Sequence, residues 1–92
     1  MITDNDREIM LIAQEECAEV TQAISKIFRF GFDSFHNQRD NRSRLEEEVG
    51  DLMCMIDLMR EADLINWNNV IDASEKKREK LRKWSKIGRA HV

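Results

Sequence analysis

Apolar residues recur at helical spacing in the first third of the chain. They define one face of a helix through four positions: Ile9, Ile12, Ala23 and Ile27. Glu16 and Glu19 occupy positions on the same face, where the pattern would place core residues. Thr3 can cap the start of this helix and Gly31 can end it, so we expect a helix from about residue 4 to Arg29.

A second acidic motif lies within a second apolar stripe of the same period. The apolar members of this stripe are Leu45, Leu52, Met55 and Met59. Glu48 falls within the stripe and Asp51 at its edge. Ser43 followed by Glu46 has the pattern of a capping box, which predicts a helix from Ser43 to about Ala62.

The last third of the chain has one more helical pattern. Asn66 can cap it, and six residues keep the spacing of one face: Trp67, Val70, Ile71, Ser74, Leu81 and Trp84. The patterns together predict an all-α bundle, made of a helical hairpin plus one or two further helices. We expect a single domain over residues 1–87 and a frayed tail over residues 88–92.

Composition supports a helical protein and narrows its partners. The 92 residues include no proline and three glycines, and 36% are charged. A chain of this size has a marginal core, so we expect oligomerisation to complete the bundle, as a dimer or a dimer of dimers. The net charge of −3 offers no general attraction to nucleic acid, and the interrupted basic run at residues 76–83 does not favour such binding. No apolar run reaches membrane-spanning length and the amino terminus is charged, so we expect a cytoplasmic protein without membrane contact.

The two acidic motifs together predict a metal site. Carboxylates held in a core face, without partners, would be costly and would repel one another. A divalent cation removes both costs, and oxygen ligands suit magnesium or manganese. A di-iron site would need histidines three residues after glutamates, and neither His36 nor His91 is so placed.

The spacing of the acidic residues resembles a family signature. Glu-Glu-x-x-Glu followed by Glu-x-x-Asp is similar to the motif pair of the all-α, MazG-like nucleoside triphosphate pyrophosphohydrolases. The matching residues are Glu15, Glu16, Glu19, Glu48 and Asp51. The resemblance spans about residues 9–84, and Gly50 before Asp51 also fits the second motif.

The resemblance implies magnesium-dependent hydrolysis of a nucleoside triphosphate between its α and β phosphates. The products would be a nucleoside monophosphate and pyrophosphate, in a nucleotide-pool housecleaning role. Four residues would be metal ligands: Glu16, Glu19, Glu48 and Asp51. Glu15 would be a further ligand or would orient the attacking water.

The resemblance also implies phosphate contacts on the last helix. Lys77 and Arg82 are the candidates, although Glu79 stands where the family pattern favours asparagine. Two other readings remain open. One is a phosphoribosyl-ATP pyrophosphohydrolase, and the other is a non-catalytic helical interaction or regulatory protein with a structural metal site.

The connection from Phe30 to Asn41 reads as irregular and holds several side chains with two interpretations. The phenylalanines of residues 28–35 could stack a nucleobase, but such residues more often close the end of a helical hairpin or bury against a partner subunit. Arg39 could contact a triphosphate or be solvated. Cys17 and Cys54 fit best as small buried hydrophobic residues in a reducing compartment.

Overall fold

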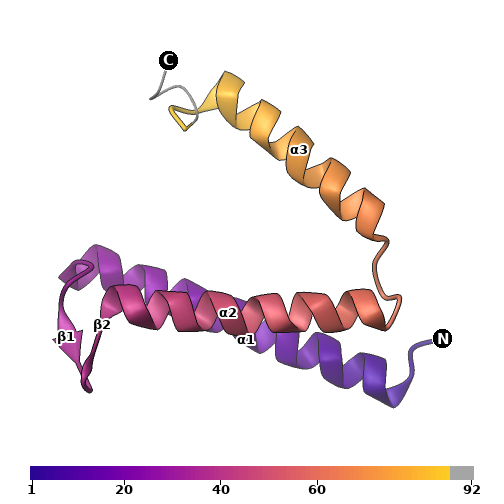
Figure 1. Cartoon of the computed structure of the whole chain (residues 1–92), viewed down its shortest axis with the longest axis horizontal. Helices are drawn as coiled ribbons and strands as arrows, with labels where there is room; N and C mark the ends of the chain where they lie inside the picture. Colours follow the sequence, from indigo (N-terminus) through magenta and orange to yellow (C-terminus); the bar gives the residue numbers. More distant parts are fainter. Residues whose placement is uncertain (88–92) are drawn as a thin grey trace. The chain divides into compact units, whose positions relative to one another are not determined.

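Residues 1–87, the part of the chain that the structure describes, form three α-helices and one short β-hairpin in this computed structural model (Figure 1). The elements in chain order are α1 (Asp4–Phe30), β1 (Phe35–His36), β2 (Arg39–Asp40), α2 (Asn41–Glu61) and α3 (Trp67–Trp84). The prediction of an all-α helical fold is confirmed. The predicted frayed tail, residues 88–92, lies outside the described residues.

Helix α1 begins and ends at the predicted signals. The Thr3 hydroxyl accepts a hydrogen bond from the Asp6 backbone N–H at 3.0 Å, and the Asp6 carboxylate accepts one from the Thr3 N–H at 3.2 Å. This reciprocal capping box satisfies two donors at the helix start. At the other end Gly31 has a φ of 88°, a backbone conformation that favours glycine, and its N–H bonds to the Ile27 carbonyl oxygen at 2.7 Å.

The prediction that the connection from Phe30 to Asn41 is irregular was wrong. Strands β1 and β2 pair antiparallel, with Phe35 opposite Asp40. The two residues between the strands, Asn37 and Gln38, have φ values of 52° and 65°, as a tight hairpin turn requires. Glutamine is an unusual choice there, so the sequence lacks the Asn-Gly signal that would have predicted the turn.

The predicted cap of α2, Ser43, was also wrong, by three residues. Its cap is Asp40, whose carboxylate accepts a hydrogen bond from the Ser43 N–H at 2.7 Å, so Ser43 lies inside the helix. The β-hairpin explains the difference, because its second strand holds Asp40 in the extended conformation that an N-cap needs, with φ −83° and ψ 169°. The predicted end was nearly correct, since the helix ends at Glu61.

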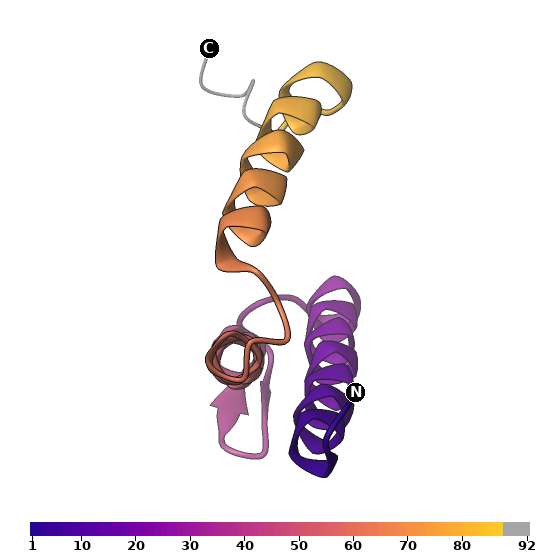
Figure 2. The same ribbon diagram turned by 90° about the vertical axis from the view of Figure 1, so that its right-hand side faces the viewer.

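Helices α1 and α2 run antiparallel and lie side by side (Figures 1 and 2). The buried apolar residues of the described chain are few: Ile9, Ala13, Ala23 and Met55. Three of them come from α1, and two of those three are alanines, which allow the helix backbones to approach closely. The remaining members of the two predicted stripes are half-buried. The helical hairpin of α1 and α2 therefore has a narrow apolar contact between its two helices, the seam, rather than a large core.

Helix α3 belongs to a second compact unit, which begins at Asp63, whereas the helical hairpin forms a unit that ends at Ala62. The Asn66 side chain caps α3 by accepting a hydrogen bond from the Asn69 N–H at 3.1 Å, which confirms the predicted start. The helix closes at Ser85, whose N–H bonds to the Leu81 carbonyl oxygen. No helix among residues 1–87 is long and apolar enough to cross a membrane.

The predicted burial of the two cysteines was wrong. Cys17 and Cys54 are both exposed, with free thiols. Each is adjacent in sequence to a seam-facing residue, Glu16 or Met55, and a one-residue step on a helix turns the side chain by about 100°. The cysteines therefore lie beside the seam instead of within it.

Candidate metal centre

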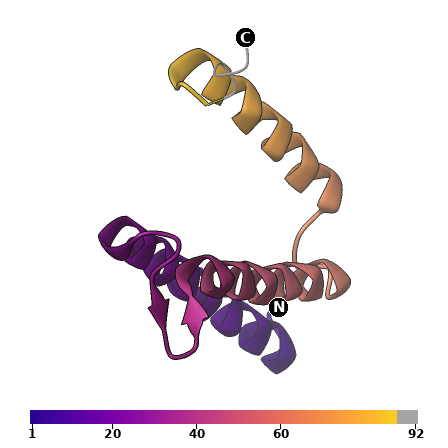
Figure 3. The ribbon, with the colours of Figure 1, turned by 60° about the vertical axis from the view of Figure 1, so that its left-hand side comes forward.

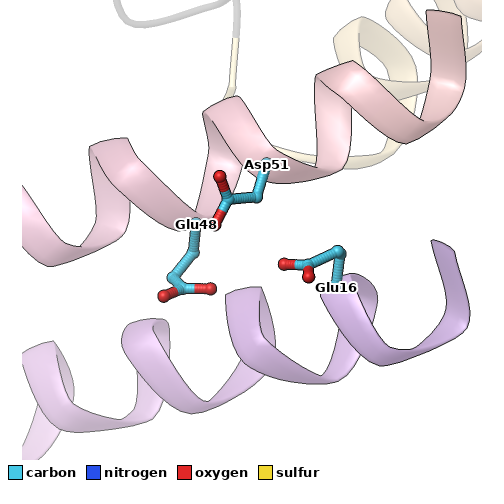
Figure 4. Close-up of side chains that lie close together, drawn as sticks. All are labelled: Glu16, Glu48 and Asp51. Atoms are coloured by element: carbon cyan, nitrogen blue, oxygen red, sulfur yellow. The ribbon is translucent and has the colours of Figure 1, made fainter. Parts of the chain in front are cut away.

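Three carboxylates from two helices gather in the seam of the hairpin. Glu16 comes from α1, and Glu48 and Asp51 come from α2 (Figure 4). One oxygen atom of each residue lies within 4.8 Å of the others, which is close enough for a single cation to contact all three. Glu16 and Glu48 are half-buried and Asp51 is exposed, so the site is reachable from solvent.

The helical period explains why these side chains meet. Glu16 follows the buried Ala13 by three residues and precedes the buried Ala23 by seven, so it lies on the seam face of α1. On α2, Glu48 precedes the buried Met55 by seven residues. The sequence places acidic residues where the hairpin requires a seam, and antiparallel packing brings them opposite one another.

The electrostatics of the group disfavour the ionised form of Glu16. Partial burial raises the pKa of Glu16, and the charges of Asp51 and Glu48, followed by those of Glu19 and Glu15, raise it further. The ion pairs formed by Arg39, Lys76 and Arg82 use other carboxylates: Glu47, Asp72 and Glu79. A bound cation would relieve this repulsion.

The chemistry of the donors fits a hard divalent cation. Carboxylate oxygens are the ligands that magnesium and manganese prefer, and imidazole and thiolate groups are absent from the described acidic group. Three protein oxygens would leave coordination positions for water or for phosphate oxygens. An arrangement of this kind is suited to reactions at phosphate groups.

The family model of the MazG nucleotide pyrophosphohydrolase domain matches residues 5–84. The chain belongs to this family. The match covers both acidic motifs and all of α3, and it confirms the resemblance noted in the sequence. No curated protein and no solved structure matches the chain.

Two further acidic residues of the MazG signature lie near the three-carboxylate group without joining it. Glu19 is exposed and follows Glu16 by one helical turn, and its charge contributes to the raised pKa of Glu16. Glu15 is exposed and adjacent to Glu16, and it contributes in the same way. Their predicted roles as ligand or water-orienting group stay predictions.

The predicted phosphate-binding residues have different surroundings. Arg39 forms an ion pair with Glu47, so this guanidinium already has a carboxylate partner. Lys77 and Arg82 line one pocket of about 470 Å³ on α3 and the residues that follow it. Arg78 lines the same pocket, and Arg82 donates a hydrogen bond of 3.3 Å to Glu79. Lys77 and Arg82 thus share a basic surface, and their role as phosphate contacts stays a prediction.

Sequence reasoning missed a second set of cations near the acidic group. Lys26 on α1 and Arg44 on α2 are half-buried and line a pocket at the connected end of the hairpin. Their spacing could have predicted this position, because Lys26 is three residues after Ala23 and Arg44 is four residues before Glu48. Both therefore lie on seam faces.

Proposed function

We propose that this MazG-family protein is a magnesium-dependent nucleoside triphosphate pyrophosphohydrolase. It would cleave the α–β phosphate bond of a ribo- or deoxyribonucleoside triphosphate and act in nucleotide-pool housecleaning. The observation that carries the proposal is the convergence of Glu16, Glu48 and Asp51 from two helices within the seam. These are three of the five signature residues of the family, and their oxygen atoms are within reach of one cation.

The reaction consumes one water. Its oxygen bonds to the α-phosphorus, the bond from that phosphorus to the bridging oxygen breaks, and the nucleoside monophosphate and pyrophosphate leave. Magnesium, or manganese in its place, would neutralise charge on phosphate oxygens and make water a better nucleophile. The residues that would hold the cation are Glu16, Glu19, Glu48 and Asp51.

The other signature carboxylate and the basic residues would position the reactants. Glu15 would accept a proton from the attacking water or serve as an additional ligand. Lys77 and Arg82 would contact the triphosphate through their shared basic surface. Arg39 would do so only after exchanging Glu47 for phosphate, and Arg82 only after exchanging Glu79. In such a site the protein contributes mainly positioning and charge stabilisation.

The assembly we propose is a cytoplasmic homodimer or homotetramer. The described chain has four buried apolar residues, whereas many large apolar side chains remain exposed, including Leu11, Met53 and Trp84. Exposed apolar surface of this extent is typical of a subunit interface. The family model spans both compact units, which supports a single functional domain over residues 1–87.

The decisive experiment is an assay of the purified protein with each common ribo- and deoxyribonucleoside triphosphate, in magnesium and in chelator. Pyrophosphate and orthophosphate are measured separately. Magnesium-dependent release of pyrophosphate with stoichiometric monophosphate is the expected result. Release of orthophosphate would instead indicate cleavage at the terminal phosphate and would contradict the proposal. If no nucleoside triphosphate is cleaved, phosphoribosyl-ATP becomes the next substrate to assay.

A further inference from the structure

The end of α1 and the start of α2 meet beside the β-hairpin (Figure 3). Residues of these elements line a pocket of about 310 Å³. Its lining combines two aromatic rings, Phe30 and Phe35, with two cations, Lys26 and Arg44. The signature of the family does not include any of these four residues. Aromatic rings beside cations can recognise a flat ring that carries phosphate.

The pocket is built on a fixed floor. Asn41 lines it and is only 5% exposed. Its side-chain amide donates hydrogen bonds to the carbonyl oxygens of Gly31 at 2.9 Å and Lys26 at 3.5 Å. These bonds tie the first residue of α2 to Lys26 of α1 and to Gly31, the residue that caps α1.

The pocket adjoins the acidic group along the same seam. Arg44 precedes Glu48 by four residues, a rise of about 6 Å along α2. Lys26 follows Glu16 by ten residues, a rise of about 15 Å along α1. Because both cations lie on seam faces, they stand between the carboxylates and the aromatic end of the pocket. The phosphates would span the shorter of these two separations, from Arg44 to Glu48 along α2.

The surroundings of the four residues leave them available to a ligand. Within residues 1–87, neither Lys26 nor Arg44 forms an ion pair with a carboxylate. The Arg29 guanidinium lies 4.9 Å from the ring centre of Phe30 and covers part of it. Among residues 1–87, no guanidinium covers the ring of Phe35 in this way, and Phe35 is 70% exposed while it lines the pocket. Phe35 is therefore the principal stacking surface.

We propose that this pocket receives the base and sugar of the nucleotide, with the base on Phe35 and Phe30 and the phosphates directed past Lys26 and Arg44 toward Glu16, Glu48 and Asp51. The proposal rests on the proposed function, whose site it extends. In this proposal the base is recognised by the segment that connects α1 to α2, and Lys26 and Arg44 contact the phosphate groups.

The test compares two probes by titration calorimetry, both in magnesium. One is the nucleoside monophosphate of the best substrate, or each common monophosphate if none is cleaved. The other is inorganic tripolyphosphate, which has no base. Phe35→Ala is expected to weaken monophosphate binding about tenfold and to leave tripolyphosphate binding unchanged. Phe35→Trp should retain monophosphate affinity, because indole also offers a stacking face.

Phe28→Ala is the matched control, since Phe28 is 86% exposed and does not line the pocket. It should bind both probes as the wild type does. Arg44→Gln should weaken both probes, because each carries phosphate. Equal monophosphate affinity in Phe35→Ala and the wild type would overturn the pocket assignment, as would an equal loss for both probes in Phe35→Ala.

The outcomes separate this inference from the proposed function. A wild type that releases pyrophosphate, with Phe35→Ala indistinguishable from it in binding, would refute the pocket alone. A wild type that releases none, but binds monophosphate in a Phe35-dependent way, would refute the activity and support the pocket.

Discussion

The side-chain amide of Asn41 donates a 2.9 Å hydrogen bond to the carbonyl oxygen of Gly31, which joins the start of α2 to the residue that ends α1. Asn41 is the one buried polar residue of the described chain. The axial position of α1 relative to α2 determines which carboxylates meet. This hydrogen bond therefore contributes to the placement of the acidic group as well as to stability.

Substitution of Asn41 should therefore destabilise the helical hairpin of α1 and α2. Asn41→Asp keeps the shape but replaces the donor with an acceptor facing two carbonyl oxygens, and we expect a loss of about 1–3 kcal/mol in the free energy of unfolding. Urea denaturation followed by circular dichroism measures this loss. Asn5→Ala, at an exposed position of α1, is the control and should change little. Equal stability of Asn41→Asp and the wild type would show that the bond contributes nothing.

Neutralising either α2 carboxylate should abolish activity without unfolding the protein. For Glu48→Gln and Asp51→Asn we expect kcat/KM to fall at least ~100-fold, because each change removes a charged oxygen from the group that would hold the cation. Helical content by circular dichroism should match the wild type. Glu46→Gln removes an exposed carboxylate from the same helix and should retain activity. Substantial turnover in Glu48→Gln would refute the site assignment.

The raised pKa of Glu16 predicts a stability that depends on pH and metal. A carboxyl whose pKa is higher in the folded state binds protons more readily there, so without metal its contribution to stability decreases as pH rises through that pKa. Glu16→Gln should therefore have a higher Tm than the wild type at pH 7 in chelator. The difference should vanish at pH values below the ordinary glutamate pKa. Magnesium should raise the Tm of the wild type more than that of the variant.

Glu8→Gln is the matched control for this experiment, since it removes one exposed carboxylate from the same helix. Its Tm difference from the wild type should not depend on magnesium. If Glu16→Gln gains no stability at pH 7 in chelator, the repulsion inferred for the acidic group is too weak to matter.

The cap of α2 predicts the opposite pH dependence. Hydrogen bonds from the backbone N–H and then the hydroxyl of Ser43 hold the pKa of Asp40 below its ordinary value, and Arg42 adds to this effect. The stability from the ionised cap is therefore present above the ordinary aspartate pKa and is lost as pH falls through the lowered one. Asp40→Asn, which keeps an accepting oxygen but no charge, should lose less stability over that acid range. Asp57→Asn, at an exposed position of α2, is the control. Thermal unfolding between pH 2 and 5 measures the stability of both variants and of the wild type. Identical acid profiles for Asp40→Asn and the wild type would contradict this role.

The exposed apolar surface predicts that stability depends on protein concentration. If subunits fold and associate together, Tm should rise with concentration, and sedimentation equilibrium should give a dimer or tetramer. A monomer with a constant Tm across a hundredfold range of concentration would contradict the proposed assembly.

The sequence by itself predicted most of the local structure and the chemistry of the acidic residues. The capping signals at Thr3 and Asn66 and the stop at Gly31 act through neighbouring backbone groups, so they could be identified without knowledge of the fold. The apolar stripes predicted which helix faces form the seam, and placed Glu16, Glu19 and Glu48 there. The prediction was wrong for Glu19, which is exposed. The family resemblance followed from the same spacing and is confirmed by the family match over residues 5–84.

Only the tertiary structure decided how these local features combine. A helical period specifies a face but not the axial position of one helix against another, so the sequence could not show that Glu16 meets Glu48 and Asp51 while Glu19 stays outside the group. The β-hairpin turned Asp40, rather than Ser43, into the cap of α2. It also brought Phe35 beside Lys26 and Arg44, because pairing between strands depends on contacts that a local pattern does not encode.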